Sequence, residues 1–210
     1  MNIISHRGYW KAEEEKNKLI SFDRSFKLGF GTETDVRDYR GELVISHDIP
    51  DENSMSLDVF FKLYNTNCNS ALTLALNIKS DGLQLKLKNK LLEFGIENYF
   101  VFDMSIPDTL GYLKNNITTF SRHSEYEPIP AFFSESKGIW LDAFGSIWFD
   151  DKIILDHIKK GKKVAIVSPE LHKRNPIEFW EYLKINKLHQ SGDIILCTDI
   201  PEDAIEFFNN

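Results

Sequence analysis

Short apolar runs recur along the chain at intervals of roughly 25 residues, with polar segments between them. The runs are rich in Ile, Val, Phe and Leu, which is typical of strands buried on both faces. They occupy residues 2–5, 30–36, 72–78, 99–102, 117–120, 138–141, 163–167 and 193–197. The pattern therefore predicts eight buried strands.

The segments between the apolar runs have helical periodicity. We expect helices over residues 21–28, 57–64, 83–94, 107–114, 152–160, 176–187 and 201–208. Their ends carry suitable residue types: Ser21 stands at a cap position, Gly95 follows the third helix, and Pro107 opens the fourth. Residues 42–46 follow a turn at Arg40 and Gly41, and they predict an additional returning strand.

The alternation of strands and helices predicts an α/β protein with parallel strands. Eight such units are the number that closes a compact (β/α)8 TIM-like barrel, and an open doubly wound sheet is the alternative. A chain of 210 residues can form one substantial core, so we expect a single domain over residues 1–210.

Composition is that of an ordinary globular protein, with 42% hydrophobic and 27% charged residues. The net charge of −7 argues against a nucleic-acid partner but permits a small anionic substrate in a local cationic pocket. The sequence has no apolar run of transmembrane length and no export-signal pattern, which predicts a cytoplasmic protein without an integral membrane segment.

Cys68 and Cys197 lie far apart and are expected to be unpaired thiols.

Polar side chains gather where the predicted strands end, which is the catalytic face of a parallel barrel. Glu33 and Asp35 lie two residues apart on one strand, so both carboxylates point the same way. Asn77 and Lys79 repeat that spacing on the next strand. The other polar residues at strand ends are His6, Arg7, His47, Asp48, Asp103, Arg122 and Asp142.

These residue types favour phosphoryl chemistry. Two buried carboxylates are costly unless a cation neutralises them, and an oxygen-only ligand set favours Mg²⁺ or Ca²⁺ over zinc. His6 and His47 can share proton transfer as base and acid. Arg7 and Lys79 add positive charge that suits phosphate oxygens.

Four segments in this order, HRG, GTETDVR, ISHD and NIK, resemble the glycerophosphodiester phosphodiesterase family. The stretch that leads into the second strand, with Asn17 in the family's Asn place, and the late CTDIP segment resemble it too. The resemblance implies a metal-dependent TIM-like barrel that hydrolyses phosphodiesters. It also implies His6 and His47 as the acid–base pair, Arg7 and Lys79 as phosphate ligands, and a metal bound by Glu33 and Asp35.

One position departs from the family pattern, because Asn77 stands where a third acidic metal ligand is usual. An amide oxygen can still coordinate a hard cation, though without charge. We expect Asn77 to remain a ligand; either the metal is then held more weakly or another carboxylate compensates for the missing charge, and Asp103 is the candidate for that compensation. Arg122 and Trp140 are further candidates for contacting substrate, although a surface or core role is as compatible with their positions.

The sequence thus predicts metal-dependent hydrolysis of a small phosphodiester, most simply of a glycerophosphodiester to an alcohol and glycerol phosphate. The same chemistry on a lysophospholipid or on a glycan that bears glycerol phosphate is an alternative. A barrel that binds phosphate-bearing ligands without catalysis is the rival from another class, and Asn77 motivates it.

Overall fold

The computed structural model describes residues 1–67 and 71–210, so the predicted free thiol of Cys68 lies outside the described residues. The described chain forms two compact units. The N-terminal unit comprises Ser5–Thr119, and the C-terminal unit comprises Met1–Ile4 and Phe120–Asn210. No helix among the described residues is both long enough and apolar enough to cross a membrane.

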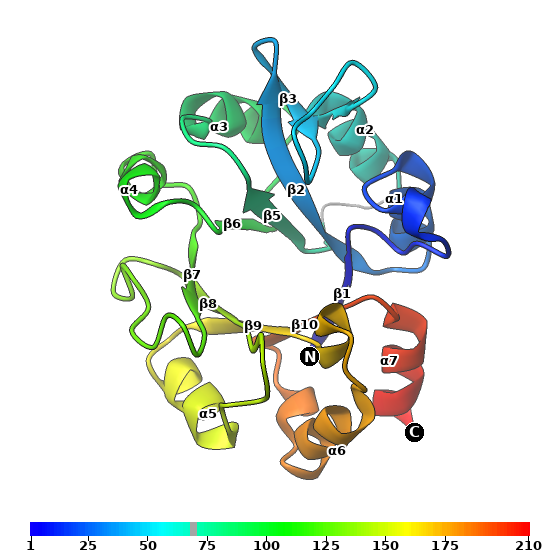
Figure 1. Ribbon diagram of the computed structural model, residues 1–210, viewed down its shortest axis with the longest axis vertical. Helices are drawn as coiled ribbons and strands as arrows, with labels where there is room; N and C mark the ends of the chain where they lie inside the picture. Colours follow the sequence, from blue (N-terminus) through cyan, green and yellow to red (C-terminus); the bar gives the residue numbers. More distant parts are fainter. Residues whose placement is uncertain (68–70) are drawn as a thin grey trace. The chain divides into compact units, whose positions relative to one another are not determined.

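The N-terminal unit is built on a sheet around β2 (Gly31–Tyr39) (Figure 1). β2 pairs in parallel with β5 (Leu74–Ile78), which pairs in parallel with β6 (Tyr99–Phe102). On its other side β2 pairs antiparallel with β3 (Glu42–Ile45), and β3 pairs with the short β4 (Met55–Ser56). The end of β1 (Asn2–His6) also lies beside β2.

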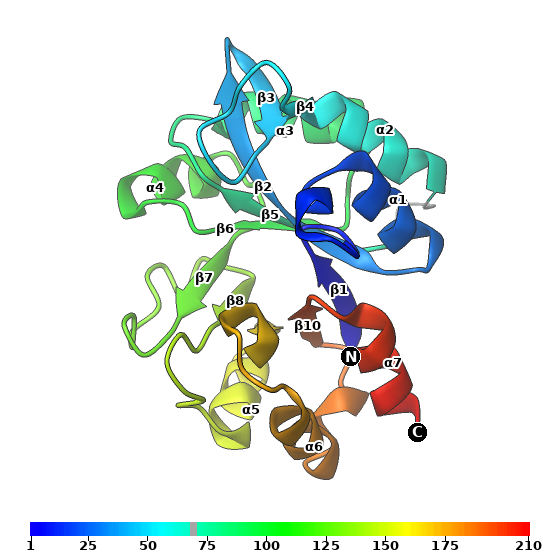
Figure 2. The ribbon, with the colours of Figure 1, turned by 45° about the vertical axis from the view of Figure 1, so that its right-hand side comes forward.

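Helices of the N-terminal unit bury an aromatic cluster against this sheet. α1 (Leu19–Lys27) and α2 (Leu57–Asn67) lie side by side (Figure 2), and Phe22 and Phe60 meet edge to face with ring centroids 4.7 Å apart. Such aromatic pairs contribute beyond the area they bury. The remaining elements are the one-turn helix η1 (Glu13–Glu15), α3 (Gln84–Glu93) and α4 (Ile106–Lys114).

The C-terminal unit has a parallel sheet in the order β10, β9, β8, β7. Its strands are β7 (Phe120–His123), β8 (Gly138–Leu141), β9 (Lys163–Val167) and β10 (Ile194–Thr198). Its helices are α5 (Asp151–Lys159), η2 (Pro169–His172), α6 (Ile177–Ile185), η3 (Leu188–Gln190) and α7 (Pro201–Asn209). Trp180 of α6 is fully buried in the core of this unit.

The predicted parallel α/β architecture is confirmed, with each expected strand and helix present. One strand is displaced: β7 begins at Phe120, not at residue 117, because Ile117 follows a left-handed turn at Asn116 and packs into the core of the N-terminal unit. The expected cap at Ser21 is wrong. α1 begins at Leu19, and the Ser21 hydroxyl lies inside the helix, where it donates to carbonyls of Glu15 and Lys18.

Candidate active site

The chain turns sharply where β1 ends, and this turn presents His6 and Arg7. Arg7 has a left-handed backbone with φ of 57°, and Gly8 follows with φ of 81°. A Cβ at Gly8 would collide with the Ser21 side chain of α1, so only glycine fits this close approach. The Gly8 amide instead donates to the hydroxyl of Thr32 at 3.0 Å, which ties the turn to β2.

β2 supplies two buried carboxylates, Glu33 and Asp35, on one face of the strand. In the parallel register of β2 and β5, Asp35 lies beside Asn77, and Val36 lies beside Ile78. Strand alternation therefore places Glu33 and Asp35 on one face, as their two-residue spacing predicted, and the register adds Asn77 to that face. Lys79 follows β5, and its amide donates to the Val36 carbonyl at 3.0 Å.

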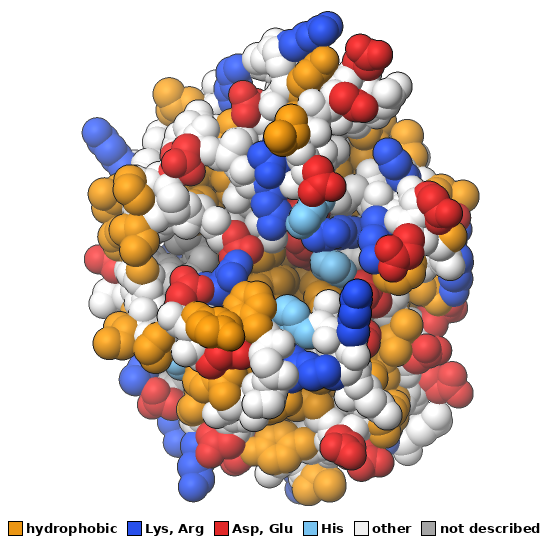
Figure 3. Space-filling model, in the orientation of Figure 1, with side chains coloured by type: hydrophobic (Ala, Val, Ile, Leu, Met, Phe, Trp, Pro, Cys, Tyr) orange, Lys and Arg blue, Asp and Glu red, His pale blue; other side chains and the backbone are white. Residues whose placement is uncertain are grey.

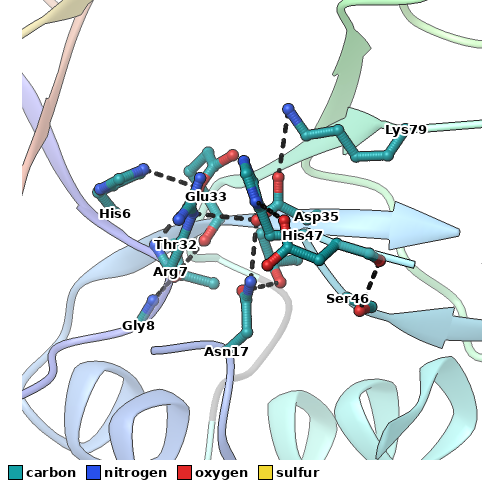
Figure 4. Close-up of polar contacts among 12 residues, drawn as sticks. His6, Arg7, Gly8, Asn17, Thr32, Glu33, Asp35, Ser46, His47 and Lys79 are labelled. Carbon is teal, nitrogen blue, oxygen red and sulfur yellow. Dashed lines mark hydrogen bonds and ion pairs between the residues drawn. The ribbon is translucent and has the colours of Figure 1, made fainter. Parts of the chain in front are cut away.

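Three basic side chains converge on these carboxylates (Figure 4). Arg7 Nε lies 3.0 Å from Asp35 Oδ2, and Lys79 Nζ lies 3.4 Å from Asp35 Oδ1. His6 Nε2 lies 3.9 Å from Glu33 Oε2. The Arg7 amide also donates to the Glu33 carbonyl and carboxylate, at 3.0 and 3.3 Å. The end of β1, the first half of β2 and the end of β5 thus bring His6, Arg7, Glu33, Asp35 and Lys79 into one compact polar cluster, while β2 itself continues to Tyr39, beyond the predicted end at residue 36.

Burial sets the electrostatics of the cluster. Burial, and after it the neighbouring charge of Asp35, raises the pKa of the Glu33 carboxyl to about 7. His6, Arg7 and Lys79 oppose this rise through their positive charge, but they do not cancel it. Ionisation of Glu33 therefore costs free energy in the folded protein, and a further cation beside the carboxylate would lower that cost.

The oxygen atoms of the cluster fit a hard divalent cation. Asp35 Oδ1 and Asn77 Oδ1 are both buried and accept no hydrogen bond, and the Glu33 carboxylate lies on the same face. Buried oxygens without donors are unusual and suit a cation ligand. Within residues 1–67 and 71–210, no group of three or more His, Cys, Asp and Glu side chains could hold a metal, so a site here would need an oxygen ligand of another type, such as the Asn77 amide.

Asp103, the predicted compensating ligand, follows β6 directly. Phe102, not Asp103, is the register partner of Asn77, and the backbone at Asp103 turns left-handed with φ of 66°. Its role as a metal ligand stays a prediction.

His47 lies on the loop after β3, where its ring is oriented by a carboxylate. His47 Nδ1 and Asp48 Oδ1 are 2.9 Å apart, and this hydrogen bond is the main cause of the lowered pKa of Asp48. Bonding at Nδ1 leaves Nε2 as the nitrogen available to a ligand. His47 and Arg7 line one polar pocket of about 390 Å³, formed by the loops after β1 and β3.

No family model matches the sequence, and no curated protein matches it either. Solved structures match over almost the whole chain. A glycerophosphodiester phosphodiesterase from Agrobacterium tumefaciens has a TM-score of 0.72 at 14% identity, covering 99% of this chain and 98% of its own. A putative glycerophosphoryl diester phosphodiesterase from Silicibacter pomeroyi has a TM-score of 0.73 at 13% identity, covering 100% and 93%.

A third structure, the glycerophosphodiester phosphodiesterase from Thermotoga maritima, has a TM-score of 0.64 at 16% identity, with 97% and 96% of the two chains covered. This chain has the glycerophosphodiester phosphodiesterase fold. The likeness confirms the fold class predicted from the alternation of elements, because the matched structures are TIM barrels with parallel strands. Within this fold, the polar cluster lies beside the ends of β1 and β5 and on the first half of β2.

Arg122 and Trp140 belong to the C-terminal unit of the glycerophosphodiesterase fold. They are register partners on β7 and β8, so their side chains share a face of that sheet. Trp140 is buried, and Arg122 Nε lies 3.4 Å from Glu127 Oε2. Contact of either residue with substrate stays a prediction.

The structure also brings residues into the cluster whose contacts the sequence did not predict. Thr32 and Thr34 flank Glu33 on β2, and their hydroxyls bind the turn after β1 and Asn17, respectively. Asn17 was identified only by its place in the family pattern, with no contact predicted for it. One sequence feature could have indicated these contacts: Thr32 and Thr34 alternate with Glu33 and Asp35 in a strand whose other residues suit burial.

Proposed function

We propose that the chain is a phosphoric diester hydrolase that cleaves a glycerophosphodiester to an alcohol and glycerol phosphate. The convergence of His6, Arg7 and Lys79 on the buried carboxylates of Glu33 and Asp35 carries this proposal. Such a cluster combines proton-transfer groups with fixed positive charge for a phosphate. The fold likeness adds support because the solved structures it matches are named as enzymes of this type.

In the proposed reaction, Arg7 and Lys79 bind and orient the phosphate through their positive charges. Glu33, Asp35 and Asn77 would hold a divalent ion, Mg²⁺ or Ca²⁺, which supplies Lewis-acid stabilisation of phosphate charge when bound. One of the histidines, His6 or His47, takes the proton of the attacking water, or of the glycerol 2-hydroxyl of the substrate, whose attack gives a cyclic phosphate that water then opens to glycerol phosphate. The other protonates the leaving alcohol oxygen.

The proposed setting is that of a cytoplasmic enzyme with a small-molecule substrate. Lys and Arg side chains interleave with Asp and Glu side chains over the face shown in Figure 3, and the net charge is −7, which does not suit a nucleic-acid partner. Cys197 is buried in β10.

Alanine substitution of either histidine tests the acid–base assignment. We expect His6→Ala and His47→Ala each to lower kcat on glycerophosphodiesters at least ~100-fold, because each removes one proton-transfer group. Far-UV circular dichroism should show an intact fold, and His189→Ala in the C-terminal unit serves as the matched control. Near-parental turnover by both variants would remove these residues from the mechanism.

A non-catalytic phosphate-binding barrel is the second candidate, and the uncharged Asn77 in the ligand set favours it. Phosphorus NMR of a phosphodiester panel, with and without a chelator, separates the two. Metal-dependent release of glycerol phosphate supports the enzyme, whereas binding without any product supports the rival. Glycerophosphodiesters, a lysophospholipid and a glycan bearing glycerol phosphate are the arms of the panel that identify the substrate.

A further inference from the structure

The loop after β1 carries a buried amide, Asn17, directly beside Asp35. Asn17 Nδ2 donates to Asp35 Oδ2 at 2.8 Å, and the Thr34 hydroxyl donates to Asn17 Oδ1 at 2.9 Å. An ionised carboxylate only accepts hydrogen bonds, so the NH₂ group must face Asp35 and the amide oxygen must face Thr34. The orientation of this amide is therefore fixed by its two neighbours.

The backbone around Asn17 is fixed as well. Asn17 has a left-handed conformation with φ of 58°, and its amide donates to the carbonyl of Arg7 at 2.9 Å. Arg7 is itself left-handed, with φ of 57°. Non-glycine residues adopt this region at a cost and keep it where the surrounding structure holds them, often at functional sites. Two such residues thus support each other at the rim of the cluster.

This arrangement determines which oxygen of Asp35 remains available. Oδ2 receives the Asn17 amide and lies 3.0 Å from Arg7 Nε. Oδ1 accepts no hydrogen bond, has Lys79 Nζ at 3.4 Å, and shares the buried face with the equally unbonded Asn77 Oδ1. Holding one oxygen of a carboxylate fixes its rotamer and directs the other oxygen to the ligand side.

We propose that Asn17 is a positioning residue for Asp35: its amide holds Oδ2 so that Oδ1 faces the ligand. The inference rests on the proposed function, because it assigns the held carboxylate to a cation and phosphate site. Asn17 acts through Asp35 and takes no part in proton transfer.

Asn17→Gly tests this directly, because glycine retains the left-handed backbone without strain and removes only the amide. Asn116→Gly is the matched control, since Asn116 has φ of 57° but is exposed and lies after α4. We expect Asn17→Gly to weaken Mn²⁺ binding to the metal-free protein about 10- to 100-fold by calorimetric titration, with kcat falling more than KM changes. Asn116→Gly should match the parent in both measurements.

Thr34→Val provides a second, independent arm. Removing the hydroxyl frees the amide to rotate, so Mn²⁺ affinity should fall in the same direction but by a smaller factor. In Asn17→Gly/Thr34→Val the second change should add almost nothing, since the two residues act through one contact. Fully additive losses, or an Asn17→Gly affinity equal to that of Asn116→Gly, would overturn the proposal.

The parent protein separates this proposal from the function on which it rests. A parent that neither binds Mn²⁺ nor releases glycerol phosphate overturns both. A parent that does both, with Asn17→Gly behaving like its control while folded by circular dichroism, overturns the positioning role alone.

Discussion

At the scale of single residues, the candidate site depends on where charge is buried. Asp35 has two cations within 3.4 Å, whereas Glu33 has a histidine at 3.9 Å and a raised pKa. Two adjacent carboxylates on one strand therefore have different environments. That difference arises only in the assembled cluster. It predicts how stability depends on pH through Glu33, and the position of Asn77 beside Asp35 predicts how metal affinity depends on residue 77.

Glu33 should make the metal-free protein less stable as pH rises. Its pKa in the folded protein, about 7, lies above the ordinary value of 4.5. Its favourable contribution is therefore complete below about pH 4.5 and is lost as pH rises through 7. We expect Glu33→Gln to exceed the parent in unfolding free energy at pH 8 by up to about 3 kcal/mol, and to differ little at pH 4.5, in urea unfolding with a chelator. If the unfolding free energies of the two proteins depended on pH in the same way, the pKa of Glu33 would not be raised by burial.

Asn77→Glu should tighten divalent-ion binding, because it restores a charged oxygen at a position beside Asp35. We expect Mg²⁺ or Mn²⁺ affinity to rise by at least ~10-fold, since ligand charge tunes the affinity of such sites. Asn65→Glu adds the same charge on the exposed face of α2 and should leave affinity unchanged. A calorimetric titration in which Asn77→Glu and Asn65→Glu coincide would remove Asn77 from the ligand set.

At the scale of elements, a pair of histidines links strand β7 to helix α5. β7 and α5 meet through a histidine pair, with His123 Nδ1 and His157 Nε2 2.9 Å apart. His157 is 5% exposed, and the Phe133 ring packs on it with centroids 5.7 Å apart. Burial, and after it the proximity of His123, lowers the pKa of His157 to about 4. The pair is therefore neutral near pH 7 and makes the packing of α5 sensitive to acid.

Acid should destabilise the protein through this pair. Because the pKa of His157 in the folded protein lies below the ordinary 6.5, the contribution is complete above pH 6.5 and is lost as pH falls through about 4. We expect His157→Gln to flatten the pH dependence of the unfolding free energy in this window by up to about 3 kcal/mol. His189→Gln, outside the pair, is the control in the same denaturation series. A parental slope in His157→Gln would show that the pair does not titrate in this way.

At the scale of the whole molecule, ligand binding should stabilise the folded chain by mass action. An ion that binds only the folded state adds about 2.7 kcal/mol at 100 times its dissociation constant, which raises Tm by roughly 5–10 °C for a protein of this size. We expect this shift with Mg²⁺ or Mn²⁺ in the parent and its loss in Asp35→Asn. Glu93→Gln, which alters an exposed carboxylate of α3, should keep the shift. A thermal melt in which Asp35→Asn responds like the parent would place the ion elsewhere.

Much of the fold could be predicted from the sequence. Strands such as Tyr99–Phe102, Gly138–Leu141 and Lys163–Val167 are found at their predicted bounds, because short runs of β-branched and aromatic residues have few other stable environments. Boundaries were less predictable where tertiary packing overrides local preference. Ile117 is apolar and suits a strand, yet it serves the core of the N-terminal unit before β7 begins.

The sequence alone determined the parallel α/β architecture and, through the two-residue spacing of Glu33 and Asp35, that these two side chains share a face of their strand. Periodicity along a chain is sufficient for that, because strand alternation is local. Only the tertiary structure decided that Asn17 holds one oxygen of Asp35 and that the pKa of Glu33 is raised. Both depend on burial and on atoms from separate elements that folding brings together. The separation of these residues along the sequence does not indicate how close their atoms lie in space.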